Sequence, residues 1–237
     1  MTPTVDGRQL KIVKILIFGA TGMIGQGVLR ESLRDTGVDH ILVVSRQSTG
    51  ATHDKLREVV QKNVADLSAL DTDLRGVDAC FFCLGVSSVG MSEQHYTRLT
   101  YDLTLSVAQS LARMSPGMVF IYVSGLGTDS TEKGRVMWAR VKGRTENALH
   151  GLPFRAVYLF RPAFVQPVAG AQSKTPWLRS VYAVMTPVLP LVKRAFPSYV
   201  TTTEEIGRAM LAVARHGYGT AVLESRDITR AARGAPA

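Results

Sequence analysis

The chain has 237 residues, of which 46% are hydrophobic and 20% charged, a composition typical of a globular protein with one sizeable core. No apolar run reaches the roughly 18 residues of a membrane-spanning helix, and the polar residues 1–9 lack the apolar core of a secretory signal, so a cytoplasmic protein is expected. The net charge of +9 arises in residues 114–237, but no zinc finger, RNA-binding motif or basic run accompanies it, so no nucleic-acid partner is expected.

Apolar runs alternate with amphipathic segments along most of the chain. Strands are expected at 11–18, 40–44, 57–61, 78–83, 118–123, 154–160 and 220–224, and helices at 22–34, 92–114, 135–150 and 203–215. Nearly continuous apolar strands are typical of a parallel sheet that is covered on both faces. Strands separated by helices form right-handed βαβ units. The sequence therefore predicts an α/β fold, a doubly wound parallel sheet with its ligand crevice at the carboxyl ends of the strands.

This alternation ends after Arg161. Six prolines follow between positions 162 and 197, and a largely apolar stretch runs from Trp177 to Val200. We therefore expect a single domain over residues 1–237, with residues 163–202 as a lid on the substrate side of the crevice. The apolar stretch could instead contact a partner or a membrane, although its prolines argue against one long amphipathic helix, so a membrane is not favoured.

The two cysteines, Cys80 and Cys83, form a CxxC pair inside an apolar strand. Residues three apart on a strand point to opposite faces, so both are expected to be core residues and not a redox pair. The five histidines show no metal-ligand spacing, and no metal is expected.

Gly19, Gly22 and Gly25 follow the first strand and open the first helix. A glycine turn in this context lets the backbone approach a pyrophosphate, and the helix N-terminus offers free N–H groups and a positive dipole end. The turn therefore predicts dinucleotide binding. The other residues of the turn assigned to this site are Thr21, Met23 and Ile24.

The end of the second strand distinguishes between two dinucleotides. An NAD site usually has an acidic residue there, which binds the ribose 2′-hydroxyl, whereas this chain has Ser45 and Arg46. Because a guanidinium makes a bidentate, charge-assisted contact with phosphate, the sequence favours NADP(H) over NAD(H). Asp66 either binds the adenine amino group or caps a helix. The residues expected beside the ribose are Leu84, Gly85 and Val86.

Four features follow one another along the chain: the glycine spacing, the Leu84-Gly85 turn, the segment Tyr122-Val123-Ser124-Gly125 and the pair Arg161-Pro162. In these features the chain resembles the atypical or extended branch of the short-chain dehydrogenase/reductase superfamily, which has an NAD(P)-binding Rossmann fold. Within that branch it is similar to epimerase-like and Tat-interacting-protein-like oxidoreductases.

The resemblance also implies roles for individual residues. Ser124 would polarise a substrate carbonyl, and Lys142 would hold the nicotinamide ribose. The residues that would border the nicotinamide are Arg161, Pro162 and Phe164. Pairing of two copies through helices 92–114 and 135–150, as in the superfamily, would give a homodimer. From the residues alone, Ser124 could also be an ordinary strand-end residue and Lys142 a solvated helix lysine.

One position departs from the superfamily. The acid–base tyrosine expected four residues before Lys142 is replaced by Trp138, whose indole N–H donates a hydrogen bond but does not exchange a proton at ordinary pH. Another tyrosine (Tyr96, Tyr101 or Tyr122) could replace it, the substrate or water could relay the proton, or the protein could bind NADP(H) without reducing anything. The two functions that remain are an NADP(H)-dependent oxidoreductase or epimerase-like enzyme for a small apolar carbonyl or hydroxyl compound, and a catalytically weak NADP(H)-sensing regulatory or binding protein.

Overall fold

The computed structural model describes residues 14–168 and 199–234. Its strands are β1 (Lys14–Phe18), β2 (His40–Ser45), β3 (Leu56–Val60), β4 (Ala79–Phe82), β5 (Val119–Val123), β6 (Ala156–Arg161), β7 (Phe164–Gln166), β8 (Val200–Thr202) and β9 (Val222–Glu224). Its helices are α1 (Met23–Arg34), α2 (Asp71–Leu74), α3 (Glu93–Thr97), α4 (Leu103–Met114), α5 (Met137–His150), α8 (Thr203–His216) and α9 (Ser225–Ala232). A short 3-10 turn, η1 (Ser68–Leu70), precedes α2, and a π-helical turn, η2 (Arg98–Asp102), joins α3 to α4.

The main sheet has seven parallel strands in the order β3-β2-β1-β4-β5-β6-β9. Its first six strands follow the order of dinucleotide-binding domains, in which the chain changes direction across the sheet between β1 and β4. The predicted doubly wound parallel sheet is therefore confirmed. The crevice at this change of direction lies beside the carboxyl ends of both strands, where the glycine turn begins.

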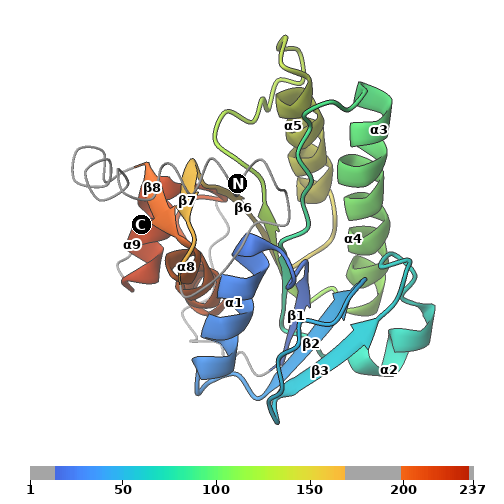
Figure 1. Ribbon diagram of the computed structural model, residues 1–237, viewed down its shortest axis with the longest axis vertical. Helices are drawn as coiled ribbons and strands as arrows, with labels where there is room; N and C mark the ends of the chain where they lie inside the picture. Colours follow the sequence, from blue (N-terminus) through green and yellow to red (C-terminus); the bar gives the residue numbers. More distant parts are fainter. Residues whose placement is uncertain (1–13, 169–198, 235–237) are drawn as a thin grey trace.

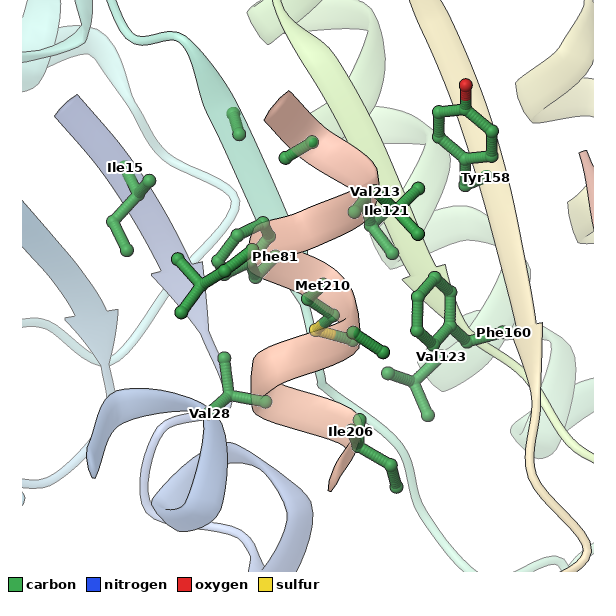
Figure 2. Close-up of a cluster of buried hydrophobic side chains, with 14 of the residues drawn as sticks. Ile15, Val28, Phe81, Ile121, Val123, Tyr158, Phe160, Ile206, Met210 and Val213 are labelled. Atoms are coloured by element: carbon green, nitrogen blue, oxygen red, sulfur yellow. The ribbon is translucent and has the colours of Figure 1, made fainter. Parts of the chain in front are cut away.

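Helices cover both faces of the sheet (Figure 1). On one face α1, α8 and α9 enclose a core to which β1, β4 and β5 also contribute, and Figure 2 shows Met210 of α8 lying over the sheet between Phe81 and Phe160. On the other face α2, α4 and α5 pack against a second core that contains Phe82, Phe120 and Tyr122. Within the described ranges, no helix is long and apolar enough to cross a membrane.

Cys80 lies in β4 as predicted, whereas Cys83 directly follows the strand. Cys80 belongs to the core beneath α4 and α5, whereas Cys83 packs against the core beneath α1 and α8, so the two thiols occupy opposite faces. Both are free, and burial raises the pKa of the Cys83 thiol to about 12 and that of Cys80 well above its usual value. Neither thiol therefore has the thiolate character of a redox cysteine.

The structure departs from the expected elements in several places. The helix expected at 92–114 contains the π-helical turn η2, and the helix expected from 135 begins at Met137. Inside the expected lid, β7 and β8 form a separate two-stranded parallel sheet. Residues 169–198, which include most of the apolar stretch Trp177–Val200, lie outside the described residues. Helix α9 was not expected from the sequence. It follows β9 with no intervening loop, and a capping box between Glu224 and Asp227 marks its start.

Candidate functional site

The glycine turn between β1 and α1 is packed too tightly for side chains. Gly19 has a φ of +79°, and a Cβ there would lie 2.7 Å from the carbonyl carbon of Cys83. A Cβ on Gly25 would lie 2.0 Å from the Gly19 carbonyl oxygen. Gly19 is therefore needed for the turn to lie against the loop after β4, and Gly25 is needed for the first turn of α1 to lie against Gly19.

The N-terminus of α1 is suited to an anion. Its N-cap residue is Gly22, so no side chain caps the first N–H groups, and the first turn contains no acidic residue. The positive end of the helix dipole thus has no neutralising group of its own. Since Gly19 and Gly25 keep side chains away from this end, a pyrophosphate fits the cradle that they form.

The two residues predicted to bind the cofactor at the end of β2 differ in their exposure and in their bonding partners. Ser45 is buried, and its hydroxyl donates a hydrogen bond to the Gln47 carbonyl (2.6 Å). Arg46 is exposed and has no ion-pair partner among residues 14–168 and 199–234. By contrast, Arg57 on β3 is paired with Asp73 at 2.7 Å. Arg46 is therefore a cation that remains available to a ligand.

Asp66 stabilises its own turn but is not the helix N-cap that was one of its two expected alternatives, because the N-cap residue of η1 is Leu67. It is exposed, and its carboxylate accepts hydrogen bonds from the Ser68 hydroxyl (2.7 Å) and the Ser68 N–H (3.2 Å) just before η1. The Ser68 hydroxyl, followed by its N–H, lowers the pKa of the Asp66 carboxyl. A contact with adenine stays a prediction.

Ser124 stands directly after β5, buried and within a short relay of hydroxyls. Its Oγ lies 2.9 Å from Thr128 Oγ1, and Thr128 donates its only hydroxyl proton to the Gly125 carbonyl (2.7 Å). Ser124 must therefore be the donor to Thr128. In this arrangement the serine proton points within its own loop, and it would have to turn toward a substrate in order to polarise a carbonyl.

Lys142 on α5 reaches the same end of β5. Its Nζ lies 3.5 Å from the Val123 carbonyl oxygen and 5.4 Å from the centroid of the Tyr122 ring. Burial lowers the pKa of Lys142 to about 8, and the charge of Glu146 opposes this shift in part. Lys142 is partly buried, so it is not the fully solvated helix lysine of the alternative interpretation.

Trp138 lies one helical turn before Lys142, at the mouth of the site. A Cβ added to Gly127 would be 3.5 Å from the indole, so the ring packs against the loop that follows Ser124. Trp138 stands four residues before Lys142, the sequence position at which the resemblance places the acid–base tyrosine.

None of the three alternative tyrosines is hydrogen-bonded to Ser124 or Lys142 in the described parts of the chain. Tyr96 and Tyr122 are buried, and desolvation raises the pKa of both phenols. The ring of Tyr101 lies beneath the Arg144 guanidinium, 4.2 Å from its centre.

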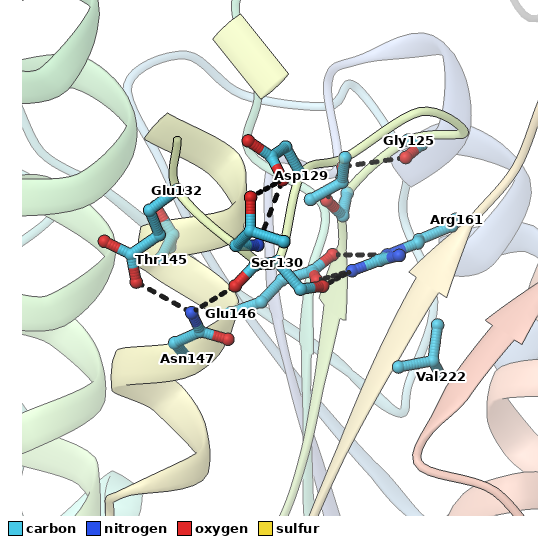
Figure 3. A network of polar contacts seen from close by, with 12 residues as sticks. Gly125, Asp129, Ser130, Glu132, Thr145, Glu146, Asn147, Arg161 and Val222 are labelled. Atoms are coloured by element: carbon cyan, nitrogen blue, oxygen red, sulfur yellow. Dashed lines mark hydrogen bonds and ion pairs between the residues drawn. The ribbon is translucent and has the colours of Figure 1, made fainter. Parts of the chain in front are cut away.

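Arg161, predicted to border the nicotinamide, uses its guanidinium inside the protein (Figure 3). It forms a two-pronged ion pair with Glu146 of α5 and donates a further hydrogen bond to Ser130 Oγ (2.6 Å). The Glu146 side chain is 1% exposed and that of Arg161 13%. The pair thus connects β6, α5 and the loop after β5, and a contact of Arg161 with nicotinamide stays a prediction.

The predicted residues converge at one edge of the sheet. The loop after β4 begins against Gly19, and the Ser124 N–H donates to the Phe160 carbonyl. The Leu126 N–H donates to the Pro162 carbonyl, which brings the Arg-Pro turn beside the loop after β5. Gly85, Val86 and Phe164 follow β4 and β6 at this same edge, and their contacts with a nucleotide stay predictions. In the part of the chain that the structure describes, no cluster of acidic, histidine and cysteine side chains could hold a metal ion.

Two functional residues were missed from the sequence. Thr128 accepts a hydrogen bond from the Ser124 hydroxyl, and Glu146 forms the ion pair with Arg161. The available signal for Glu146 was its place four residues after Lys142 on the same helix face, but its burial depends on β6, which is distant in sequence.

Residues 19–149 match the model of a protein family described as NAD(P)H-binding. A relative from Chaetomium globosum, named Protein FMP52, mitochondrial, is 22% identical over 156 residues, which cover 63% of this chain and 65% of that protein. Protein HTATIP2 of Rattus norvegicus is 26% identical over 151 residues, which cover 62% of this chain and 61% of that protein. The chain thus spans somewhat less than two thirds of the length of these two relatives.

Among solved structures, the Bordetella bronchiseptica enzyme WbmF in complex with NAD+ superposes with a TM-score of 0.67. The identity is 15%, and the superposition covers 96% of this chain and 79% of that chain. At this identity the likeness is one of fold.

The comparisons contradict the expected cytoplasmic location. Several relatives carry names that place them in mitochondria. The expectation rested on the absence of an apolar core in residues 1–9, which argues only against a secretory signal. Mitochondrial transit peptides are amphipathic and need no such core, so the inference from the sequence was wrong.

Proposed function

Since the chain belongs to the NAD(P)H-binding family, we propose that it is an NADP(H)-dependent oxidoreductase or epimerase-like enzyme that acts on a small, apolar carbonyl or hydroxyl compound. One observation carries this proposal: the glycine cradle, Ser124 and the partly buried Lys142 lie at one edge of the parallel sheet. When bound, the nicotinamide would supply or accept a hydride.

Residues of the chain would bind the cofactor and polarise the substrate oxygen. The uncapped N-terminus of α1 would bind the pyrophosphate, and Lys142 would contact the nicotinamide ribose. Ser124 would turn its proton from Thr128 to the substrate oxygen. Exposed apolar side chains, Leu126 and Val136, flank the loop after β5, which favours an apolar substrate beside that loop.

The preference for NADP(H) is assigned to Arg46. We expect Arg46→Ala to weaken NADPH binding about 10- to 100-fold, because a charge-assisted hydrogen bond contributes roughly 1.5–3 kcal/mol. NADH affinity should change less than threefold. Isothermal titration with both nucleotides measures the effect, and Arg113→Ala, which removes an exposed arginine at the end of α4, is the matched control.

A parallel loss of NADPH and NADH affinity in Arg46→Ala would indicate a general effect on the site. An unchanged NADPH affinity would contradict the assignment of the phosphate contact to Arg46.

Turnover tests the proposed activity directly. Purified protein with NADPH should oxidise the cofactor in the presence of at least one member of a panel of apolar aldehydes and ketones, and Ser124→Ala should slow the reaction. If NADPH binds but no member is reduced, the proposed activity is wrong.

That second outcome would support an NADP(H)-sensing regulatory or binding protein. Trp138 favours this alternative, because it removes the proton donor that the superfamily uses. Such a protein would bind a partner with an affinity that changes when NADPH is added. Pairing of two copies through α3, α4 and α5 stays a prediction, which sedimentation tests.

A further inference from the structure

We propose that Lys142 is itself the acid–base group of this site, giving its proton directly to the substrate oxygen in place of the missing tyrosine. This inference rests on the proposed oxidoreductase function. It assigns to the lysine a catalytic step in addition to its contact with the ribose.

The position of the superfamily tyrosine contains no group that can exchange a proton. Trp138 occupies it and packs against Gly127. The acid that follows Ser124 most closely in the chain is Asp129, and its carboxylate accepts hydrogen bonds from the Thr131 hydroxyl (2.6 Å) and the Gly134 N–H (2.6 Å). Asp129 is thus used in organising its own loop.

Lys142 is placed where such a group is needed. It lies one helical turn after Trp138, and its Nζ is 3.5 Å from the carbonyl of Val123, the residue directly before Ser124. This long contact leaves donor capacity on the ammonium. Lys142 forms no ion pair within residues 14–168 and 199–234, because the nearby carboxylate of Glu146 is bound to Arg161.

The charged and titratable groups around Lys142 come from three elements. The Tyr122 ring on β5 faces the ammonium, Glu146 lies one turn further along α5, and Arg161 of β6 neutralises that glutamate. Desolvation of the ammonium lowers the pKa of Lys142 to about 8, and the charge of Glu146 opposes this shift only in part. An acid–base group works best when its pKa lies near the working pH.

The proposed step balances without another reactant. In the reducing direction a bound nicotinamide would supply the hydride to the carbonyl carbon of the substrate, and Nζ of Lys142 gives its proton to the carbonyl oxygen. The carbonyl is reduced, the nicotinamide is oxidised, and the neutral amine regains a proton from water. In the oxidising direction the neutral amine takes the hydroxyl proton.

The pH dependence follows from the form of the lysine that each direction needs. Reduction requires the ammonium, so kcat/KM should be constant below pH 8 and fall tenfold per pH unit above it. Lys142→Arg should lower kcat/KM by about 100-fold or more and abolish this break, because a guanidinium does not release its proton in this range. Lys133→Arg, at an exposed loop position, is the matched control and should leave both unchanged.

A second pair of variants separates proton transfer from ribose binding. In a Trp138→Tyr background the phenol can give the proton, so Lys142→Arg should cost much less in kcat than it does in the natural background. Equal losses in both backgrounds, appearing mainly in the KM for NADPH, would overturn the proposal and leave the lysine as a ribose anchor.

A spectroscopic readout needs no turnover. After reductive methylation with ¹³C-formaldehyde, one dimethyl-lysine resonance, absent from Lys142→Arg, should titrate with a midpoint near pH 8. A midpoint above pH 10 would overturn the proposal. Failure to bind NADPH would instead refute the proposed function, whereas binding and turnover with a pH profile unaffected by Lys142→Arg would refute the acid–base role alone.

Discussion

Gly25→Ala is expected to weaken NADPH binding by at least about 100-fold, the loss of two or more charge-assisted contacts. The added Cβ would lie 2.0 Å from the Gly19 carbonyl oxygen, so the turn and the start of α1 would have to move apart. The N–H groups of the helix would then no longer point at the pyrophosphate. Isothermal titration measures the loss, and circular dichroism shows whether the fold is retained.

Two other glycines serve as controls for Gly25. A Cβ on Gly22 would lie 3.3 Å from the Gly19 carbonyl oxygen, so Gly22→Ala should have a smaller effect on binding. A Cβ on Gly117, in the turn before β5, would meet nothing within 4 Å, so Gly117→Ala should leave binding unchanged. If a folded Gly25→Ala protein binds NADPH within a few-fold of the natural chain, the glycine turn does not hold the phosphates.

Glu146→Gln is expected to cause the largest loss of stability. It leaves the Arg161 guanidinium, 13% exposed, without its carboxylate partner. Removing one member of a buried ion pair costs about 3–5 kcal/mol, which for a domain of this size lowers the Tm by about 10 °C. Urea unfolding of the variant and the natural chain gives the difference directly.

The exposed ion pair between Glu93 and Arg140 provides the comparison for Glu146. Its atoms are 2.7 Å apart, but the Glu93 side chain is 53% exposed. Glu93→Gln should therefore cost less than about 1 kcal/mol. The double variant Glu146→Leu/Arg161→Met should be more stable than Glu146→Gln, because it leaves no charge buried alone. Equal stability of Glu146→Gln and Glu93→Gln would contradict the structural importance of the buried pair.

Much of the fold could be predicted because its signals are local. Each central strand is a continuous apolar run, and the glycine turn follows the first of them, which is enough to indicate the sheet and its crevice. The resemblance to the short-chain dehydrogenase/reductase superfamily is confirmed by the family match and by the relatives. The π-helical turn η2 could not be predicted, since it continues a helical sequence pattern without a break.

The site was predictable only where one residue type determines the geometry. Gly19 and Gly25 are of this kind, and the end of β5 and the first half of α5 place Ser124 and Lys142 at the same edge. The burial of Lys142 and the pairing of Glu146 with Arg161 depend on packing between α5, β5 and β6. No local pattern carries that information, so the chemistry of the lysine emerged only from the structure.

We propose that the Gly19–Gly25 turn and Arg46 bind the pyrophosphate and the 2′-phosphate of NADP(H). Isothermal titration of the natural chain with NADPH and with NADH at the same salt concentration tests it most directly. We expect saturable binding of one nucleotide per chain, with NADPH bound about 10-fold or more tightly than NADH, since one charge-assisted contact distinguishes them. Absence of binding for both nucleotides would contradict the site, and tighter binding of NADH would contradict the role of Arg46.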